Sequence, residues 1–177
     1  MLWFRKRVWL AIAVTEEAAR AINAMKAIIF CPIFQALGLF IFLVPWSVYA
    51  VYLASSGEIT TGTVTTSAGE ITVKSFQYTT NIRYAALYLL FSYFWTSEFI
   101  TALGQIVVAM AVAMWYFTRD KSEIGSLTVV QASCTSVIYH SGTAAFGSLI
   151  IAVIKTVRAV VAYFQKKAKD SGNKIVQ

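Results

Sequence analysis

Long apolar stretches alternate with short polar segments along this chain of 177 residues. Three ranges carry no formal charge, 27–57, 99–118 and 124–154, and about 20 apolar residues are enough to cross the hydrocarbon core of a bilayer. The first two ranges predict transmembrane helices over 27–54 and 84–118. The third range begins with the polar stretch SLTVVQASCTS, so we expect a polar connection over 119–136 and an apolar helix over 137–165.

Basic residues flank this third helix on both sides. The segment TRDK precedes it, and several Lys and Arg residues follow it, up to a basic tail at 166–177. Because Lys and Arg gather beside the cytoplasmic ends of membrane helices, both flanks are predicted to be cytoplasmic. This favours a re-entrant or surface-lying helix. The alternative is a spanning helix whose basic tail lies on the other side.

The first 26 residues have the pattern of an amphipathic helix on the cytoplasmic side. Val8 and Ile12 fall near one face, whereas Glu16 and Arg20 fall near the other and are spaced to form an ion pair. The basic flanks suit a position at the membrane surface, and a fully solvated helix is the alternative. The apolar run after the first basic residues is too short for a signal peptide, so we expect no cleavage.

Residues 55–83 differ in composition from the rest of the chain. They are rich in Thr, Ser, Gly and β-branched residues, and GEIT occurs at 57–60 and again at 69–72. This pattern predicts an extramembrane loop resembling a short β-hairpin. The formal charges of the loop cancel, which fits the translocated side of a membrane. The predicted fold class is therefore an all-α membrane protein with one β-hairpin-like loop.

The amino-acid composition narrows the range of possible functions. Hydrophobic residues make up 58% of the chain and charged residues 13%, which is too apolar for a soluble domain. The surplus of seven positive charges reflects membrane topology, so we expect no nucleic-acid partner. Since the sequence holds no catalytic triad, phosphate-cradling loop or metal-ligand spacing, we expect neither an enzyme nor a cofactor or metal site. Cys31 and Cys134 are expected to be separate buried thiols.

Pro45 lies well inside the first predicted span. Proline removes one backbone hydrogen bond, so the helix is predicted to bend near Trp46. The freed carbonyl favours a face that packs against protein or borders a cavity. Gly, Ala and Ser residues along the second span would permit close contacts between helices.

Polar or small side chains recur along one face of the second span. Spacings of three and four residues place six of them on one stripe: Ser92, Trp95, Glu98, Ala102, Gln105 and Ala109. An acidic side chain in a bilayer costs a few kcal/mol or more. We therefore expect Glu98 to turn toward a protein interior or a water-filled cavity.

Aromatic residues gather near this acid in the two spans. Aromatic faces attract quaternary ammonium groups, and a nearby carboxylate adds Coulomb attraction. The same rings also fit an ordinary interfacial belt of Trp and Tyr, and composition does not choose between these explanations. The candidate substrate-binding residues are Trp95, Glu98, Gln105, Trp46, Tyr49 and Phe99.

Two long segments contain recognisable motifs, YFWTSEFITALGQIVVAMAVAMWYFTRDKS from residue 93 and HSGTAAFGSLIIAVIKTVRAVVAYFQKK from residue 140. They resemble the choline transporter-like family, in which W-T-x-x-F-I, G-Q and A-x-W-Y-F are followed by H-x-G-T-x-A-F-G-S-L-I-I-A. The segments RKRVWLAIAVTEEAARAI, FCPIF and VPWSVYAVYLASSGE resemble the same family in the same order. The resemblance implies an integral membrane protein that moves choline, with this chain covering only part of the full transporter.

Several residues fall on motif positions of that family besides the candidate substrate-binding ones. They are Thr96, Gly104, Trp115, His140, Gly142, Phe146 and Gly147. His140 is explained by a structural hydrogen bond of its ring or, alternatively, by a proton-linked role. Two features depart from the family pattern: Glu98 stands where an uncharged polar residue is expected, and the loop at 55–83 lacks cysteines.

We therefore expect a partial choline transporter-like protein that moves choline or related amines and is not competent alone. So few spans enclose no alternating-access pathway, hence we expect self-association or further protein partners in addition to membrane lipids and a choline-like amine. The alternative is a structural or accessory transmembrane subunit without transport activity. The sequence leaves open which membrane holds it, the plasma membrane or that of an organelle such as the mitochondrion.

Overall fold

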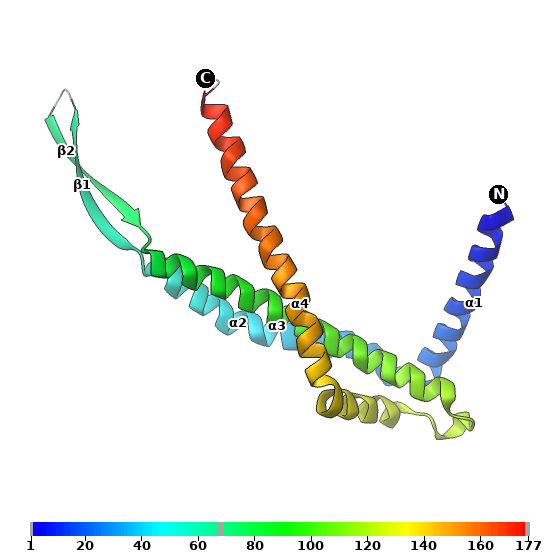
Figure 1. The fold of residues 1–177 in the computed structure, drawn as a ribbon. Coiled ribbons are helices and arrows are strands. Elements are labelled where there is room, and N and C mark those ends of the chain that lie inside the picture. The colour runs from blue at the N-terminus through cyan, green and yellow to red at the C-terminus, as the bar shows by residue number, and fades with distance from the viewer. Residues whose placement is uncertain (1, 67–68, 176–177) are drawn as a thin grey trace. The chain divides into compact units, whose positions relative to one another are not determined.

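The computed structural model describes residues 2–66 and 69–175, and four α-helices form most of this part of the chain (Figure 1). The helices are α1 (Leu2–Ala24), α2 (Cys31–Ser55), α3 (Thr80–Phe117) and α4 (Ser126–Ile175). Strands β1 (Glu58–Thr66) and β2 (Gly69–Gln77) connect α2 to α3, and short 3-10 helices cover Lys26–Phe30 and Lys121–Glu123. The predicted helical membrane fold with one β-hairpin is confirmed.

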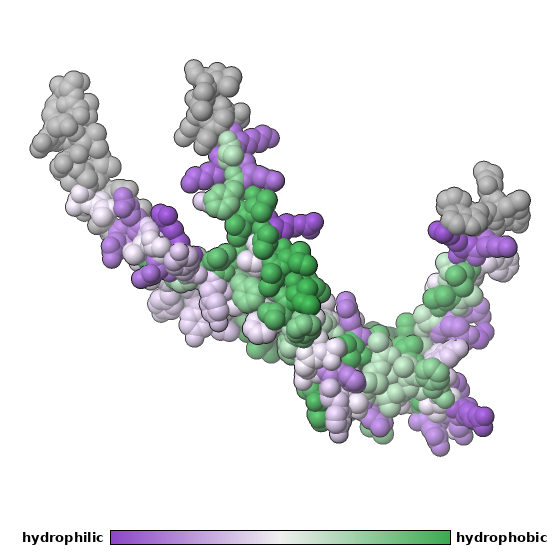
Figure 2. Space-filling view, in the orientation of Figure 1, coloured by the Kyte–Doolittle hydropathy of each residue, from purple (hydrophilic) through white to green (hydrophobic). Residues whose placement is uncertain are grey.

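Three helical segments are long and apolar enough to cross a membrane. They are Lys26–Ser55, Thr80–Phe117 and Ser126–Lys169. Many of their large apolar side chains are exposed, and Figure 2 shows hydrophobic residues gathered over the middle of α4. So much apolar surface needs lipid or further protein to cover it. At about 1.5 Å per residue, α3 is also longer than a ~30 Å hydrocarbon core, so it tilts or extends beyond the bilayer.

Helix α4 is longer than the predicted range 137–165. It begins at Ser126, because the hydroxyls in the polar stretch bond within the helix: the Ser133 hydroxyl donates to the carbonyl of Val129 over 2.8 Å. The buried side chains of Val129, Ala132 and Ser136 recur at spacings of three and four, as one helix face requires. The predicted basic tail is also helical, as far as Ile175. The predicted positions of both ends of this helix, which rested on polar composition, are therefore wrong.

The chain divides into two compact units. The first unit comprises Met1–Leu39 and Glu98–Leu149, and the second comprises Phe40–Ser97 and Ile150–Gln177. The core of the first unit consists of Ala21, Met25, Ile28, Ala111, Trp115, Val129 and Ala132. Ala111 of α3 and Ala132 of α4 have no exposed surface. Small residues at these points let helix backbones approach closely, which is the usual basis of helix packing in membranes.

Helix α1 contributes Ala21, near its C-terminal end, to this core, and Met25 of the core follows directly after the helix. The residues of its predicted apolar face stay exposed, with Val8 at 54%, Ile12 at 54% and Ile22 at 43%. The predicted ion pair between Arg20 and Glu16 is confirmed at 2.8 Å, and Glu17 lies 2.9 Å from the same guanidinium. Because all three side chains are exposed, these pairs add little stability.

The turn after α3 is held by a lysine and an aspartate. The Lys121 ammonium donates to the carbonyls of Trp115 and Tyr116 and lies 4.7 Å from the centroid of the Trp115 ring. It thus satisfies carbonyls that the end of a helix leaves unpaired. The Asp120 carboxylate accepts from the backbone N–H and hydroxyl of Ser122 over 2.9 and 2.6 Å, which lowers the pKa of Asp120.

In the second unit, α2 packs against α3 through Trp46. The indole N–H of Trp46 donates to the carbonyl of Leu89 over 3.0 Å, and its ring centroid lies 5.1 Å from that of Tyr93. Helix α2 continues through Pro45. The residue after the proline therefore supplies the contact between the two helices.

The hairpin pairs its strands in antiparallel register, from Glu58 opposite Gln77 to Thr66 opposite Gly69. Where it meets the helices, the Tyr78 hydroxyl donates to the carbonyl of Ala54 over 3.3 Å. The end of α2 and the start of α3 are thereby held together beside the hairpin.

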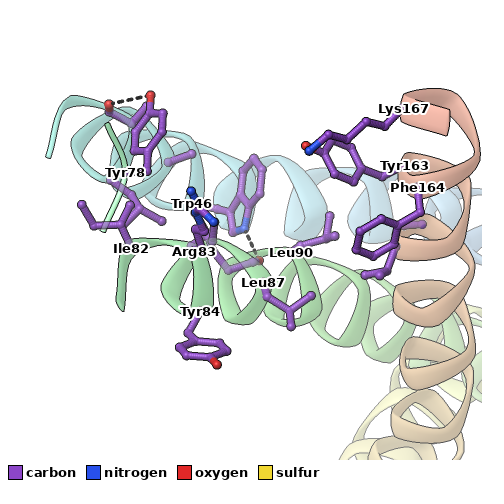
Figure 3. A pocket seen from close by; sticks show the side chains of 17 residues that line it. Trp46, Tyr78, Ile82, Arg83, Tyr84, Leu87, Leu90, Tyr163, Phe164 and Lys167 are labelled. Atoms are coloured by element: carbon purple, nitrogen blue, oxygen red, sulfur yellow. Dashed lines mark hydrogen bonds between the residues drawn. The ribbon is translucent and has the colours of Figure 1, made fainter. Parts of the chain in front are cut away.

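The C-terminal part of α4 belongs to the same unit as the hairpin. Lys167 of α4 lines one cleft with Tyr78, which precedes α3, and with Arg83, in the first turn of α3 (Figure 3). Since the hairpin leads directly into α3, we expect the end of α4 to lie on the hairpin side of the membrane. This geometry favours the spanning alternative for the third helix over the re-entrant one.

Cysteine labelling tests this topology. In a background with Cys31 and Cys134 replaced by serine, we expect Lys166→Cys and Gln77→Cys to react with a membrane-impermeant maleimide from the same side of sealed vesicles. Ser122→Cys is the control for the opposite side. Modification of Lys166→Cys from the side that labels Ser122→Cys would show that the third helix does not span.

The small-residue contact of α3 yields a stability prediction. Ala111→Leu forces a larger side chain into a contact without free space and should destabilise the fold by about 1 to 3 kcal/mol. Ala109→Leu, two residues away on an exposed position of the same helix, is the matched control and should change little. Unfolding in mixed micelles with increasing denaturing detergent measures both variants. Equal losses would contradict the packing described here.

Candidate substrate-binding face of α3

The predicted polar stripe lies on a single helix, α3, and covers about half of its length, residues 92–109. Glu98 is half-buried on this helix, whereas Trp95 is 39% exposed and Gln105 is also exposed. The hydroxyl of Ser92 donates to the carbonyl of Leu89 over 2.8 Å. The stripe therefore carries a half-buried carboxylate at Glu98 and exposed side chains at Trp95 and Gln105.

The candidate aromatic residues lie in different surroundings. Trp46 packs against Tyr93, and the Trp95 ring lies 6.0 Å from that of Phe91 between centroids. Tyr49 of α2 is 67% exposed. Phe99, which follows Glu98 on α3, is half-buried. Of these rings, Trp95 lies one helical turn before the acid.

Gly104 allows a close contact between α3 and α2 in the first unit. A Cβ atom at this position would lie 2.4 Å from the side-chain oxygen of Gln35, much closer than two such atoms can approach. The Gln35 amide therefore lies directly against the α3 backbone. Sequence reasoning missed Gln35, although an amide within the apolar stretch CPIFQALGLF was a signal that could have found it.

Two other residues at family motif positions on α3 are at least partly covered by the chain. Trp115 is a member of the buried core and carries the Lys121 ammonium over its ring. Thr96 is half-buried between Trp95 and Ser97. The Ser97 hydroxyl donates to the carbonyl of Phe94 over 3.0 Å. Some motif residues on α3 thus pack in the core, and others remain partly exposed.

The motif positions on α4 mostly face outward. Phe146 is 67% exposed, and a Cβ atom added to Gly142 or Gly147 would meet no atom within 4 Å among the described residues. His140 is half-buried. The buried face of the helix carries other small residues, such as Ala144 at 3% exposure. Among the described residues, no atom lies close enough to Gly142 or Gly147 to require glycine there, and Phe146 is exposed.

The arrangement on α3 can attract a small organic cation. An indole face and a carboxylate one turn apart supply cation–π and Coulomb attraction without requiring a hydrogen-bond donor on the ligand. A helix that crosses a bilayer bears such a carboxylate only where protein or water meets it. These features make the stripe a candidate binding face.

Comparison with known proteins identifies the family to which this chain is similar. The family model described as plasma-membrane choline transporter matches residues 1–177. Choline transporter-like protein 1 of Caenorhabditis elegans is 34% identical over 197 aligned residues, which cover 100% of this chain and 25% of the relative. Choline transporter-like protein 2 of Dictyostelium discoideum is 34% identical over 163 residues, covering 92% of this chain and 25% of the relative.

A third relative shows the same proportions. Choline transporter-like protein 4 of Xenopus laevis is 29% identical over 205 residues, covering 98% of this chain and 29% of that protein. The chain thus spans about a quarter of the length of these relatives. With the whole chain matched by the family model and three helices able to cross a bilayer, the chain is an integral membrane protein that belongs to the choline transporter-like family.

Proposed function

We propose that this chain forms part of a pathway that moves choline or a related amine across a membrane, with the stripe on α3 facing the substrate. Its relatives carry the name choline transporter-like, and choline is a quaternary ammonium ion. The observation that carries the proposal is the half-buried carboxylate of Glu98 on a helix apolar enough to cross a bilayer.

The polarity of the stripe requires surroundings other than lipid. Glu98 is only half covered by this chain, and Gln105 is exposed. A charged or strongly polar side chain in hydrocarbon costs a few kcal/mol on insertion scales and more in simulations of isolated helices. The stripe is therefore completed by further protein or by a water-filled path, as a transport pathway provides.

The helical rise divides the stripe into two positions. Trp95 and Glu98 differ by about 4.5 Å along the axis, so both can contact one ammonium group. Gln105 lies about 10 Å further along than Glu98, which is too far to contact the same small cation together with the acid. We assign Trp95 and Glu98 to the cation site and Gln105 to a later position on the path.

Further helices are part of the proposal. The chain spans about a quarter of its relatives' length, and its motif residues Gly142, Phe146 and Gly147 lie on the outward face of α4. Glycines on an open helix face suit close contact with another helix. We infer that transport needs additional protein, either further copies of this chain or other subunits.

Removing the indole of Trp95 tests the cation site. Trp95→Ala should weaken choline binding by about 1 to 2 kcal/mol, because the cation–π contact is lost. Binding of labelled choline to the purified chain in liposomes gives the measurement. Tyr88→Ala removes an aromatic ring from an exposed position on the same helix, at 71% exposure, and should leave affinity unchanged. Equal affinity for Trp95→Ala and the original protein would remove the indole from the site.

Neutralising Glu98 tests the electrostatic part. Glu98→Gln keeps the size of the side chain and removes its charge, so choline affinity should fall by about 1 to 4 kcal/mol and should lose much of its dependence on ionic strength. Glu123→Gln, in the short 3-10 helix, is the matched control. If no choline binds at any salt concentration while the chain co-purifies in a stable complex, the accessory subunit is the better description.

A further inference from the structure

The second unit contains an open cleft of about 1020 Å³ between α2, α3 and the C-terminal part of α4 (Figure 3). Its walls are mainly apolar, with Leu87 and Leu90 from α3 facing Val160 and Phe164 from α4. Trp46 of α2 also lines it. No residue of the α3 stripe is among the residues that line the cleft. The cleft is therefore a separate place in the molecule with its own chemistry.

Two cations line one part of this cleft. Arg83 lies in the first turn of α3, one turn before Leu87, and Lys167 lies one turn after Tyr163 on α4. In Figure 3 the side chains of Lys167 and Tyr163 extend from α4 toward Trp46. We call the positions of Arg83 and Lys167 the cationic mouth of the cleft, and the apolar lining residues its floor.

No opposite charge compensates these cations in the described part of the chain. No carboxylate lines the cleft, and neither Arg83 nor Lys167 forms an ion pair with another described residue. Two like charges beside an apolar surface raise each other's free energy, and an anion between them lowers it. A cation such as choline is repelled from this mouth.

We propose that the cleft binds an anionic phospholipid. Its phosphate lies between Arg83 and Lys167, and an acyl chain lies along Leu87, Leu90 and Val160. The planar guanidinium of Arg83 can bind a phosphate through two hydrogen bonds, and the Lys167 ammonium adds a point charge. Basic pockets between transmembrane helices are known to hold anionic head groups in this way.

The apolar floor distinguishes a lipid from a free phosphate ion. A phosphate alone would satisfy the mouth but would leave the leucine and valine side chains uncovered. An acyl chain covers this surface, and the burial of its methylene groups is favourable. The aromatic rings of Trp46 and Tyr163 suit the boundary between head group and hydrocarbon, where such amphipathic rings concentrate.

Native mass spectrometry of the purified chain tests the proposal. The protein, extracted in mild detergent, is titrated with phosphatidylglycerol and, separately, with phosphatidylcholine of the same acyl chains. We expect phosphatidylglycerol to bind about tenfold or more tightly than phosphatidylcholine, because only the anionic lipid keeps a net charge for the two cations. This comparison uses the unmodified protein and does not depend on the stability of any variant.

A matched pair of double variants locates the site. Arg83→Gln with Lys167→Gln should abolish the preference for phosphatidylglycerol. Arg158→Gln with Lys169→Gln makes the same change in net charge at exposed positions of α4 that do not line the cleft, and should preserve the preference within about twofold. Circular dichroism confirms that each variant keeps its helix content.

Three results would overturn the proposal. Equal binding of the two lipids would remove the role of the anionic charge. An unchanged preference in the variant of Arg83 and Lys167 would place the lipid elsewhere. Displacement of phosphatidylglycerol by inorganic phosphate at similar concentration would show that the cleft recognises phosphate without the acyl chain. Because choline binding is measured separately, each of these outcomes leaves the assignment of the α3 stripe untouched.

Discussion

The free-energy cost of a polar side chain in hydrocarbon governs the arrangement of this protein. Several hydroxyl groups avoid the cost within their own helix, since Ser47 donates to the carbonyl of Leu43 and Thr156 to that of Ala152. The buried hydroxyl of Ser136 is an exception and has no hydrogen-bond partner among the described residues. A carboxylate cannot be satisfied in this way, because it has no proton to give to a carbonyl. An ionised carboxylate such as that of Glu98, which is half-buried on α3, is instead accommodated by protein donors or water.

Close approach between helices depends on residues with little or no side chain. Ala111 and Ala132 bring α3 and α4 into the core of the first unit, and Gly104 admits the amide of Gln35 against the α3 backbone. Lipid tails are as apolar as leucine, so shape and polar contacts, more than hydrophobicity, decide which helices associate. An added Cβ atom at Gly142 or Gly147 of α4 meets no described atom within 4 Å, so this helix face leaves room for another helix.

Two regions of this chain carry opposite charges and therefore suit different ligands. The stripe on α3 offers a carboxylate and an indole face, which suit a quaternary ammonium ion. The cleft of the second unit offers Arg83 and Lys167 above an apolar floor, which suits an anionic amphiphile. We propose that the two regions serve different ligands, a cation at the stripe and an anionic lipid at the cleft.

The sequence alone determined the features that depend on local periodicity. The apolar spans, the hairpin over 58–77 and the pairing of Glu16 with Arg20 follow from residues close together in the chain. The outer limits of α4 could not be predicted in this way, because serine and threonine hydroxyls can bond to carbonyls of their own helix and so let polar residues continue it.

Only the tertiary structure decided which distant residues meet. Three such meetings join segments far apart in sequence. Gln35 contacts Gly104, and Trp46 donates to the Leu89 carbonyl. Arg83 and Lys167 line the same cleft. No spacing rule relates such residues, since their distance depends on how whole helices pack. Packing of side chains of complementary size, together with the need to pair every buried polar group, selects those neighbours.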